Sequence, residues 1–247
     1  MKRNCKELKR ISRENLSGHY GIPMGVFLIA NAITFAIGLP FSMLMDEHAS
    51  TTQTITYYIA RLLILLIGVV LSSGQDKVHL QMARKQKYDL FMVFYCFKNQ
   101  PQRYLLAGFA TLLISLICSI PAILGALWIR LEQSAVSIIC CILFCVITMA
   151  LCIWVQLSVQ LIYYILLDHE DITVKSAFQS SLHLMKGNRG RLLYMYCSFL
   201  GMELLSLISL GIGYLWVKPY ESQSFVNFYL EILGELPDAG TAFNQTA

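Results

Sequence analysis

Residues Ser181 to Tyr229 decide the fold: SLHLMKGNRGRLLYMYCSFLGMELLSLISLGIGYLWVKPYESQSFVNFY. A basic turn with two glycines, residues 186–191, precedes an apolar run that ends at Trp216, and Lys218, Pro219 and Tyr220 follow it. This order predicts a transmembrane helix that begins on the cytoplasmic side. The run contains one ionisable residue, Glu203, and a charge inside a bilayer needs a partner or water.

The whole chain has the composition of a membrane protein. Of its 247 residues, 56% are hydrophobic and only 14% are charged, whereas soluble domains carry roughly 25% charged residues. We therefore predict an all-α, polytopic membrane helix bundle. The net charge of +4 describes the loops of such a protein, so we expect no nucleic-acid partner.

Five apolar runs are long enough to cross a bilayer. The predicted spans are residues 20–45, 55–74, 104–128, 134–167 and 192–217. A signal peptide is the rival interpretation of the first run, but that run is too long for a cleaved leader. The fourth run would be about 51 Å long as a helix, so it must tilt, kink, project from the membrane or divide in two.

Basic residues collect in three segments outside these spans. Residues 1–19 form a predicted amphipathic helix, and residues 75–103 and 168–191 form interfacial segments; together they hold 16 of the 19 Lys and Arg. The positive-inside rule makes them cytoplasmic, with the N-terminus inside, in contact with the anionic inner leaflet. The acidic tail, residues 218–247, is then predicted to be external, with a short amphipathic helix.

An internal repeat is predicted at an offset of 88 residues. Residues 103–128 align with 191–216 without a gap, pairing Arg103 with Arg191 and Trp128 with Trp216. Each copy would comprise a span, a surface segment and a second span, so the two copies would run parallel. Chance similarity between two apolar helices is the alternative.

Arg61 and Glu203 lie at matching predicted depths, roughly 18 to 20 Å from the cytoplasmic ends of their helices. The candidate intramembrane polar cluster comprises Arg61, Glu203, Asn31, Gln156 and Gln160. Three interpretations stay open: an interhelical ion pair that fixes register, a solute or proton site, or an Arg61 side chain that extends to the interface.

Motifs for catalysis or metal binding are absent from the sequence. No nucleophile elbow, HExxH motif or phosphate-binding loop occurs, and the eight cysteines form no CxxC pair. Asp168, His169, Glu170 and Asp171 could form a metal site, but consecutive acids more often end a helix in water. We therefore expect no enzyme activity, metal or cofactor.

The C-terminal third resembles the signature of the DUF975 family, multi-pass integral membrane proteins of Gram-positive bacteria whose function is unknown. The matching positions are Ser181, Met185, Lys186, Gly187, Asn188, Ser198, Phe199, Gly211, Gly213, Pro219, Tyr220, Phe228 and Tyr229. Arg189 replaces a more usual Lys, and Gly201-Met202 replaces a Gly-Trp-like pair. The resemblance implies a location in the bacterial plasma membrane and supplies no activity.

Two functions fit these features. The first is a non-catalytic protein that organises the membrane or supports a membrane complex, with a protein partner or a second copy. The second is a small transporter or an export or immunity accessory that uses the polar cluster around Arg61 and Glu203. A membrane-embedded lipid-modifying enzyme is a weaker third, because no nucleophile is evident.

Overall fold

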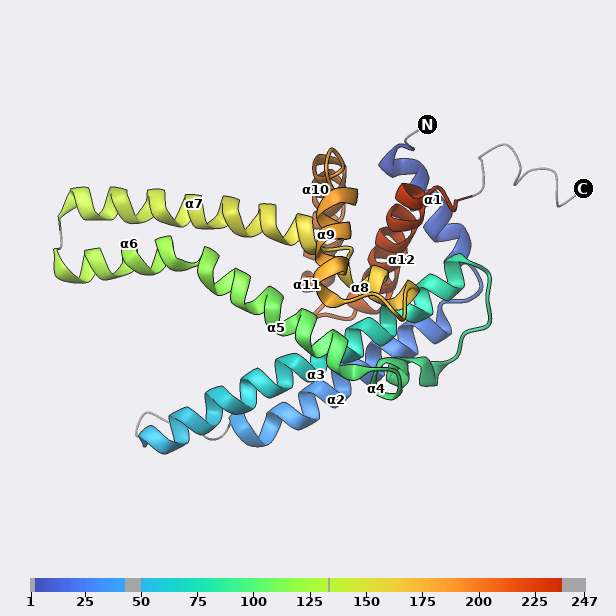
Figure 1. The fold of residues 1–247 in the computed structure, drawn as a ribbon, viewed down its shortest axis with the longest axis horizontal. Helices are drawn as coiled ribbons and strands as arrows, with labels where there is room; N and C mark the ends of the chain where they lie inside the picture. Colours follow the sequence, from blue (N-terminus) through green and yellow to red (C-terminus); the bar gives the residue numbers. More distant parts are fainter. Residues whose placement is uncertain (1–2, 43–49, 133, 237–247) are drawn as a thin grey trace, which may run out of the picture. The chain divides into compact units, whose positions relative to one another are not determined.

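The protein is helical throughout the part that a computed structural model describes, residues 3–42, 50–132 and 134–236, and no strand occurs in those ranges (Figure 1). The helices form two compact units. Unit 1 comprises Met1–Pro101 and Arg191–Ala247, and unit 2 comprises Gln102–Gly190. Each unit is described by itself below.

Five stretches of helix are long and apolar enough to cross a membrane, which confirms the predicted number. They are α2 (Gly21–Ser42), α3 (Thr51–Ala83), α5 with α6 (Pro101–Cys118 and Ile120–Leu131), α7 with α8 (Ala135–Val159 and Ile162–Asp168), and α10 with α11 (Arg189–Cys197 and Leu200–Ile208). Residues 43–45 of the first predicted span lie outside the described residues. The all-α prediction is confirmed, and these helices are compatible with a membrane helix bundle.

Helix α3 continues well beyond the predicted end of the second span at Gly74. This glycine has a steric role, because a Cβ atom there would lie 2.1 Å from the carbonyl oxygen of Val93. The chain then turns at Lys85, whose φ is 55°, into the 3-10 helix η1 (Leu90–Phe94) and α4 (Tyr95–Lys98). The interfacial segment 75–103 is therefore the end of a long helix followed by two short ones.

The fourth and fifth spans also differ from their predicted limits. The fourth divides at Gln160 into α7 and α8, which is one of the outcomes expected from its length. The fifth ends at Ile208 rather than at residue 217, because Leu210 and Gly211 adopt left-handed conformations with φ of 54° and 87°.

Helix α12 (Tyr214–Leu233) is the central helix of unit 1. It packs against α1 (Cys5–Leu16), α2, α3 and α11, and its residues from Phe225 to Leu230 are all buried. In Figure 1 it lies beside α1. The tail was expected to contain one short amphipathic helix. The helix found is longer and much of it is buried, because neighbouring helices enclose polar residues that suggested exposure.

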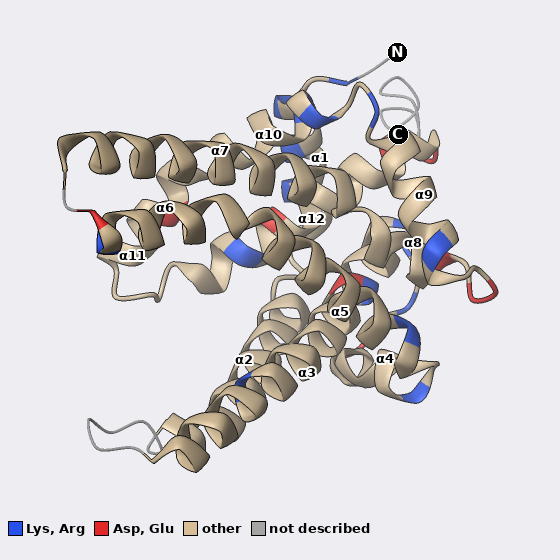
Figure 2. Cartoon of the chain, turned by 60° about the vertical axis from the view of Figure 1, so that its left-hand side comes forward, with Lys and Arg blue, Asp and Glu red and all other residues tan. Residues whose placement is uncertain are grey.

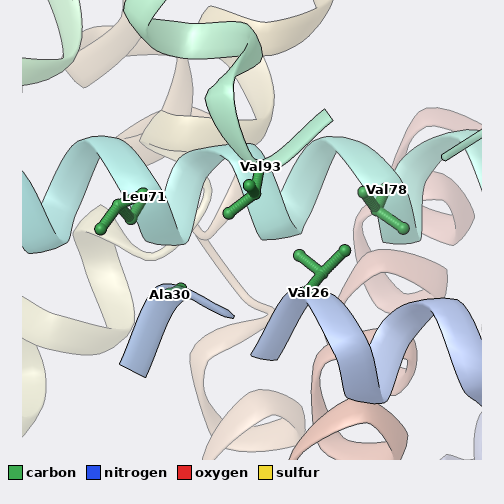
Figure 3. Close-up of a cluster of buried hydrophobic side chains, with 5 residues drawn as sticks. All are labelled: Val26, Ala30, Leu71, Val78 and Val93. Atoms are coloured by element: carbon green, nitrogen blue, oxygen red, sulfur yellow. The ribbon is translucent and has the colours of Figure 1, made fainter. Parts of the chain in front are cut away.

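The α2–α3 hairpin is packed at one end and exposed at the other. Val26 and Ala30 of α2 face Leu71 and Val78 of α3, and Val93 of η1 closes the cluster (Figure 3). Beyond this cluster, side chains such as Phe35 and Leu63 are exposed, as expected for helices that face lipid. The hairpin thus projects an apolar end from the core of unit 1.

Unit 2 is a hairpin of α5–α6 and α7 whose base carries α8 and α9 (Val174–Leu184). Gly125 allows close packing, because a Cβ there would lie 3.1 Å from the Cα atom of Cys141. Figure 2 shows few charged residues along α6 and α7. At the base, the buried Ser181 hydroxyl donates a hydrogen bond of 2.7 Å to the carbonyl of Ser158.

The internal repeat stays a prediction. An offset of 88 residues does align the order of elements, a long helix followed by short helices and a second long helix, in 51–131 and 135–208. Each unit contains part of both copies.

Candidate functional site

Glu203 is paired with Lys218 and not with Arg61, so the structure does not contain the Arg61–Glu203 ion pair that was one of the three open interpretations. The Lys218 ammonium donates hydrogen bonds of 2.7 Å to Glu203 Oε1 and 2.7 Å to Glu221 Oε2. The side chains of Lys218, Glu203 and Glu221 are 35%, 29% and 9% exposed, so this triad lies at the edge of the core. The partner comes from α12, whose polar residues had been assigned to the tail.

The triad holds the Lys218 ammonium between two carboxylates, that of Glu203 on α11 and that of Glu221 on α12.

Arg61 and Asn31 lie together, as predicted, in a groove on the α2–α3 hairpin. The groove has a volume of about 370 Å³ and is lined by Asn31, Thr34, Phe35, Gly38, Leu39, Ser42, Arg61 and Ile64. Asn31 Nδ2 donates to the carbonyl of Phe27 over 2.7 Å. Arg61 is exposed, and it has no ion-pair partner among the described residues.

Gln156 and Gln160 belong to unit 2, whereas the rest of the predicted cluster lies in unit 1. Gln156 is exposed on α7, and Gln160 is the residue at which α7 ends. The structure therefore divides the predicted cluster into a triad at Glu203, a groove at Arg61 and two glutamines of unit 2.

A second ion pair joins the beginning of α10 to the end of α12 and also contacts the N-terminal segment. Arg191 Nη2 lies 2.8 and 2.6 Å from the two carboxylate oxygens of Glu231, and it also donates to the carbonyl of Arg3 over 2.7 Å. Glu231 is only 8% exposed. Nearby, Arg84 donates to Glu235 over 2.8 Å. Acids of the predicted external tail thus lie beside arginines of the predicted cytoplasmic segments.

Helix α12 runs back alongside α10 and α11. Lys218, near its start, pairs with Glu203 of α11, and Glu231, near its end, pairs with Arg191 of α10. The end of α12 is therefore level with the beginning of α10. An external tail would require a membrane between the end of α12 and the beginning of α10. The ion pair between these two ends does not fit that arrangement.

Neutral polar side chains on the other faces of α12 make hydrogen bonds with α3 and α1. The His79 ring nitrogen Nδ1 donates to Gln223 Oε1 over 2.9 Å, and Asn227 Nδ2 donates to the Ser12 hydroxyl over 2.8 Å. Gln223 Nε2 and Asn227 Oδ1 are buried without a hydrogen-bond partner among the described residues. Because residues 223 and 227 are one helical turn apart, these two atoms lie on the same face of α12.

Lys9 and Phe199 fasten α1 to the break between α10 and α11. The Lys9 ammonium lies 3.6 Å from the centroid of the Phe199 ring and donates to the carbonyl of Ser198 over 2.9 Å. Phe199 is fully buried, and its ring meets Tyr220 edge to face at 5.2 Å between centroids. This contact brings the N-terminal helix, the last span and α12 together.

No group of three or more His, Cys, Asp or Glu residues in the described parts of the chain could hold a metal ion. Asp168 is the last residue of α8, and His169, Glu170 and Asp171 follow it. Arg103 donates to the carbonyl of His169 over 2.7 Å. Helix termination accounts for their position.

A family model described as "Protein of unknown function (DUF975)" matches residues 1–235. The chain belongs to this family. No curated protein and no solved structure matches it. The resemblance found in the C-terminal third thus extends to almost the whole DUF975 chain.

The signature residues of this DUF975 chain hold the fold together. Ser181, Met185, Phe199, Phe228 and Tyr229 are fully buried. Gly187 and Gly211 take left-handed conformations with φ of 80° and 87°, and a Cβ on Gly213 would lie 2.6 Å from the Ser206 hydroxyl. Asn188 Nδ2 donates to the carbonyl of Leu184 over 2.8 Å. The remaining signature residues are Lys186 and Ser198, next to these turns, and Pro219 and Tyr220 on α12.

The sequence contained two signals that could have located α12. Glu231 and Glu235 are complementary in charge to Arg191 and Arg84, which a search for partners of the basic segments could have used. The spacing of Phe225, Phe228 and Tyr229 also indicates a helical face that needs cover.

Proposed function

We propose that this DUF975 protein is a non-catalytic membrane protein that organises the bilayer or supports a membrane complex. The observation that carries this proposal is the pairing of the ionised groups of α12. Lys218, Glu221 and Glu231 all pair with groups on neighbouring parts of unit 1 or on α12 itself. Groups that a catalyst or a carrier would need for chemistry are occupied in joining helices.

The N-terminal helix supports an electrostatic contact with anionic lipid. Leu8, Ser12 and Leu16 of α1 are buried in unit 1, whereas Lys6, Arg10 and Arg13 are exposed. This helix therefore cannot insert the buried face into the bilayer, and its basic face supplies the attraction.

The η1–α4 segment provides a different kind of contact. Phe91 is 79% exposed and Phe97 is also exposed, with exposed Lys87 and Lys98 nearby in the chain. Exposed aromatic side chains with lysines are typical of segments at the membrane interface. This surface and the basic face of α1 would together attach unit 1 to the inner leaflet.

We propose that this protein lies in the bacterial plasma membrane with both the N-terminus and the end of α12 on the cytoplasmic side. Because five crossings from a cytoplasmic N-terminus end outside, α12 must then return through the membrane beside α10 and α11. The pairs Arg191–Glu231 and Arg84–Glu235 support this orientation, because their arginines belong to basic segments that the positive-inside rule assigns to the cytoplasm. This differs from the external location expected for the acidic tail, of which residues 237–247 lie outside the described part of the chain.

Complementation of a deletion strain under membrane stress tests the proposed role. The variant Glu203→Gln/Lys218→Met/Glu221→Gln removes every charge of the triad, and a scaffold should keep its function because neutral groups can replace an ion cluster. Lys6→Glu/Arg10→Glu/Arg13→Glu should lose function, because it reverses the basic face.

The matched control for the basic face is Lys6→Arg/Arg10→Lys/Arg13→Lys, which keeps all three charges and should complement fully. Immunoblots of the membrane fraction confirm that each variant is inserted at the wild-type level. Loss of function in the triad variant, with function kept in the charge-reversed variant, contradicts the proposal.

A second candidate function is transport of a proton or a small polar solute. The unpaired buried atoms Gln223 Nε2 and Asn227 Oδ1 favour it, because such atoms in a core bind water or a ligand. Reconstituted vesicles with an internal pH dye would show proton flux that Gln223→Leu/Asn227→Leu abolishes. If the protein is a scaffold, wild type and the double variant should both show only the background proton flux.

A further inference from the structure

The groove on the α2–α3 hairpin joins one cation to an apolar wall. Arg61 is exposed into a volume of about 370 Å³, within the range of about 300–1,000 Å³ that small-molecule sites occupy. Phe35, Leu39 and Ile64 supply the apolar wall. A ligand that satisfies both parts must have a negative group and a hydrocarbon part.

The length of the groove fits an amphiphile at the edge of the bilayer. Asn31 lies about 17 Å from Ser42, the last residue of α2, at 1.5 Å per residue. Ser50 caps α3, and polar residues Thr51 to Thr54 precede its apolar run. The groove therefore runs from the polar end of the hairpin into the depth of the membrane.

Arg61 can reach the level of lipid phosphates from its place on α3. Its Cα lies about 9 Å beyond Ile55, where the apolar run begins. The long arginine side chain can extend toward the interface while its methylene groups remain among apolar side chains. Exposure to hydrocarbon without an anion would cost several kcal/mol at least, so an anionic partner is expected.

Other polar groups in the groove do not neutralise Arg61. The Thr34 hydroxyl donates to the carbonyl of Ala30 over 2.8 Å, and the Ser42 hydroxyl donates to that of Leu39 over 2.7 Å. Asn31 Nδ2 is likewise used within its own helix, which leaves its side-chain oxygen as an acceptor. These residues make a polar edge but provide no negative charge.

We propose that this groove binds an anionic phospholipid, with Arg61 on the phosphate and an acyl chain along Phe35, Leu39 and Ile64. Asn31 would accept a hydrogen bond from a hydroxyl of the headgroup. The leaflet is that of the α2–α3 loop, opposite to the one contacted by the basic face of α1. The inference requires only that the hairpin spans the membrane and is independent of the scaffold role.

Native mass spectrometry of the purified full-length protein tests the site. The protein is exchanged into mixed micelles that contain phosphatidylglycerol and phosphatidylcholine, and retained lipids are counted. Wild type should retain phosphatidylglycerol in preference, and Arg61→Met should weaken that retention about tenfold, because a charge-assisted bidentate contact is lost. Arg61→Lys should fall between them, because it keeps the charge and loses the planar fork.

Arg130→Met is the matched control, since it removes the same charge from an exposed position near the end of α6, outside both the groove and the basic face of α1, and should leave this retention unchanged. Circular dichroism and gel filtration establish that each variant is folded. Equal retention by wild type and Arg61→Met overturns the proposal. Displacement of the lipid by inorganic phosphate alone also overturns it in favour of a free-anion site, as does an Arg61-dependent crosslink to a protein in place of lipid.

Discussion

Units 1 and 2 differ in how their long apolar helices are covered. Both contain a hairpin of long apolar helices, but unit 1 also encloses α12, whose Glu221, Gln223 and Asn227 are buried. Among the described residues of unit 2, no helix buries a charged side chain in this way, and side chains along α7 such as Ile139 and Ile142 remain exposed. Unit 1 therefore has a packed core of apolar and hydrogen-bonded polar side chains, like that of a water-soluble protein. Much of the surface of unit 2 is apolar and needs lipid to cover it.

We infer from this difference that most of the polar contacts and most of the interactions that stabilise the fold lie in unit 1. Its buried charges are useful only while both partners are present, since an unpaired buried charge is strongly unfavourable. The hairpin of unit 2 has no charge to lose along its apolar length, and Gly125 allows its helices to approach through shape. Substitutions should therefore have much larger effects in unit 1.

The largest effect is expected from breaking the Arg191–Glu231 pair. Arg191→Met leaves the buried Glu231 carboxylate without its partner and should lower the free energy of unfolding by about 3–5 kcal/mol. Equilibrium unfolding in mixed micelles measures it. Arg10→Met, which removes an exposed pair with Glu14, is the control and should cost less than about 1 kcal/mol. Similar losses from both variants would contradict the assigned burial.

A direct contrast between the units comes from truncating one large side chain in each. Phe228→Ala, in the core of unit 1, should cost about 3–5 kcal/mol because it leaves a cavity. Ile139→Ala, on the exposed face of α7, should change the stability in micelles by about 0.5 kcal/mol or less. If the exposed substitution is the more damaging, α7 is covered by protein and not by lipid.

Alanine substitutions at two glycines of α3 distinguish the effect of close packing on stability from the effect of helix propensity. Gly74→Ala would place a Cβ 2.1 Å from the Val93 carbonyl oxygen, so the contact with η1 must open at a cost of about 1–3 kcal/mol. Gly68→Ala meets no atom within 4 Å and should be neutral or slightly stabilising. Thermal unfolding of both variants should give opposite shifts in Tm. Equal shifts would contradict the steric role assigned to Gly74.

The smallest effect is expected at the half-exposed pair of Glu203 and Lys218. A double-mutant cycle with Glu203→Gln and Lys218→Met should give a coupling energy of about 0.6 kcal/mol, because in the unfolded state within a membrane both polar groups find other partners. The same cycle with Arg61→Met in place of Lys218→Met should give no coupling. Coupling between Glu203 and Arg61 would restore the pair predicted from their depths.

The sequence predicted the fold class and the number of spans because long apolar runs leave few alternatives. It did not predict α12, because Glu221, Gln223 and Asn227 are polar and their burial depends on partners such as His79 and Ser12 that are distant in sequence. Depth along two helices suggested Arg61 as the partner of Glu203. Depth does not specify which faces meet, and the turn at Gly211 brings Lys218 there instead.

Helix α12 is enclosed by its neighbours and packs against α1. Disulfide crosslinking in native membranes tests it with Ser12→Cys/Asn227→Cys, since the two native side chains are in contact at 2.8 Å. The background protein has its eight natural cysteines replaced, and Ser12→Cys/Ser222→Cys is the control for chance collisions. We predict a rapid intramolecular crosslink in the first pair and little in the control. Absence of that crosslink, with residue 227 labelled by an impermeant thiol reagent from outside the cell, would contradict the account.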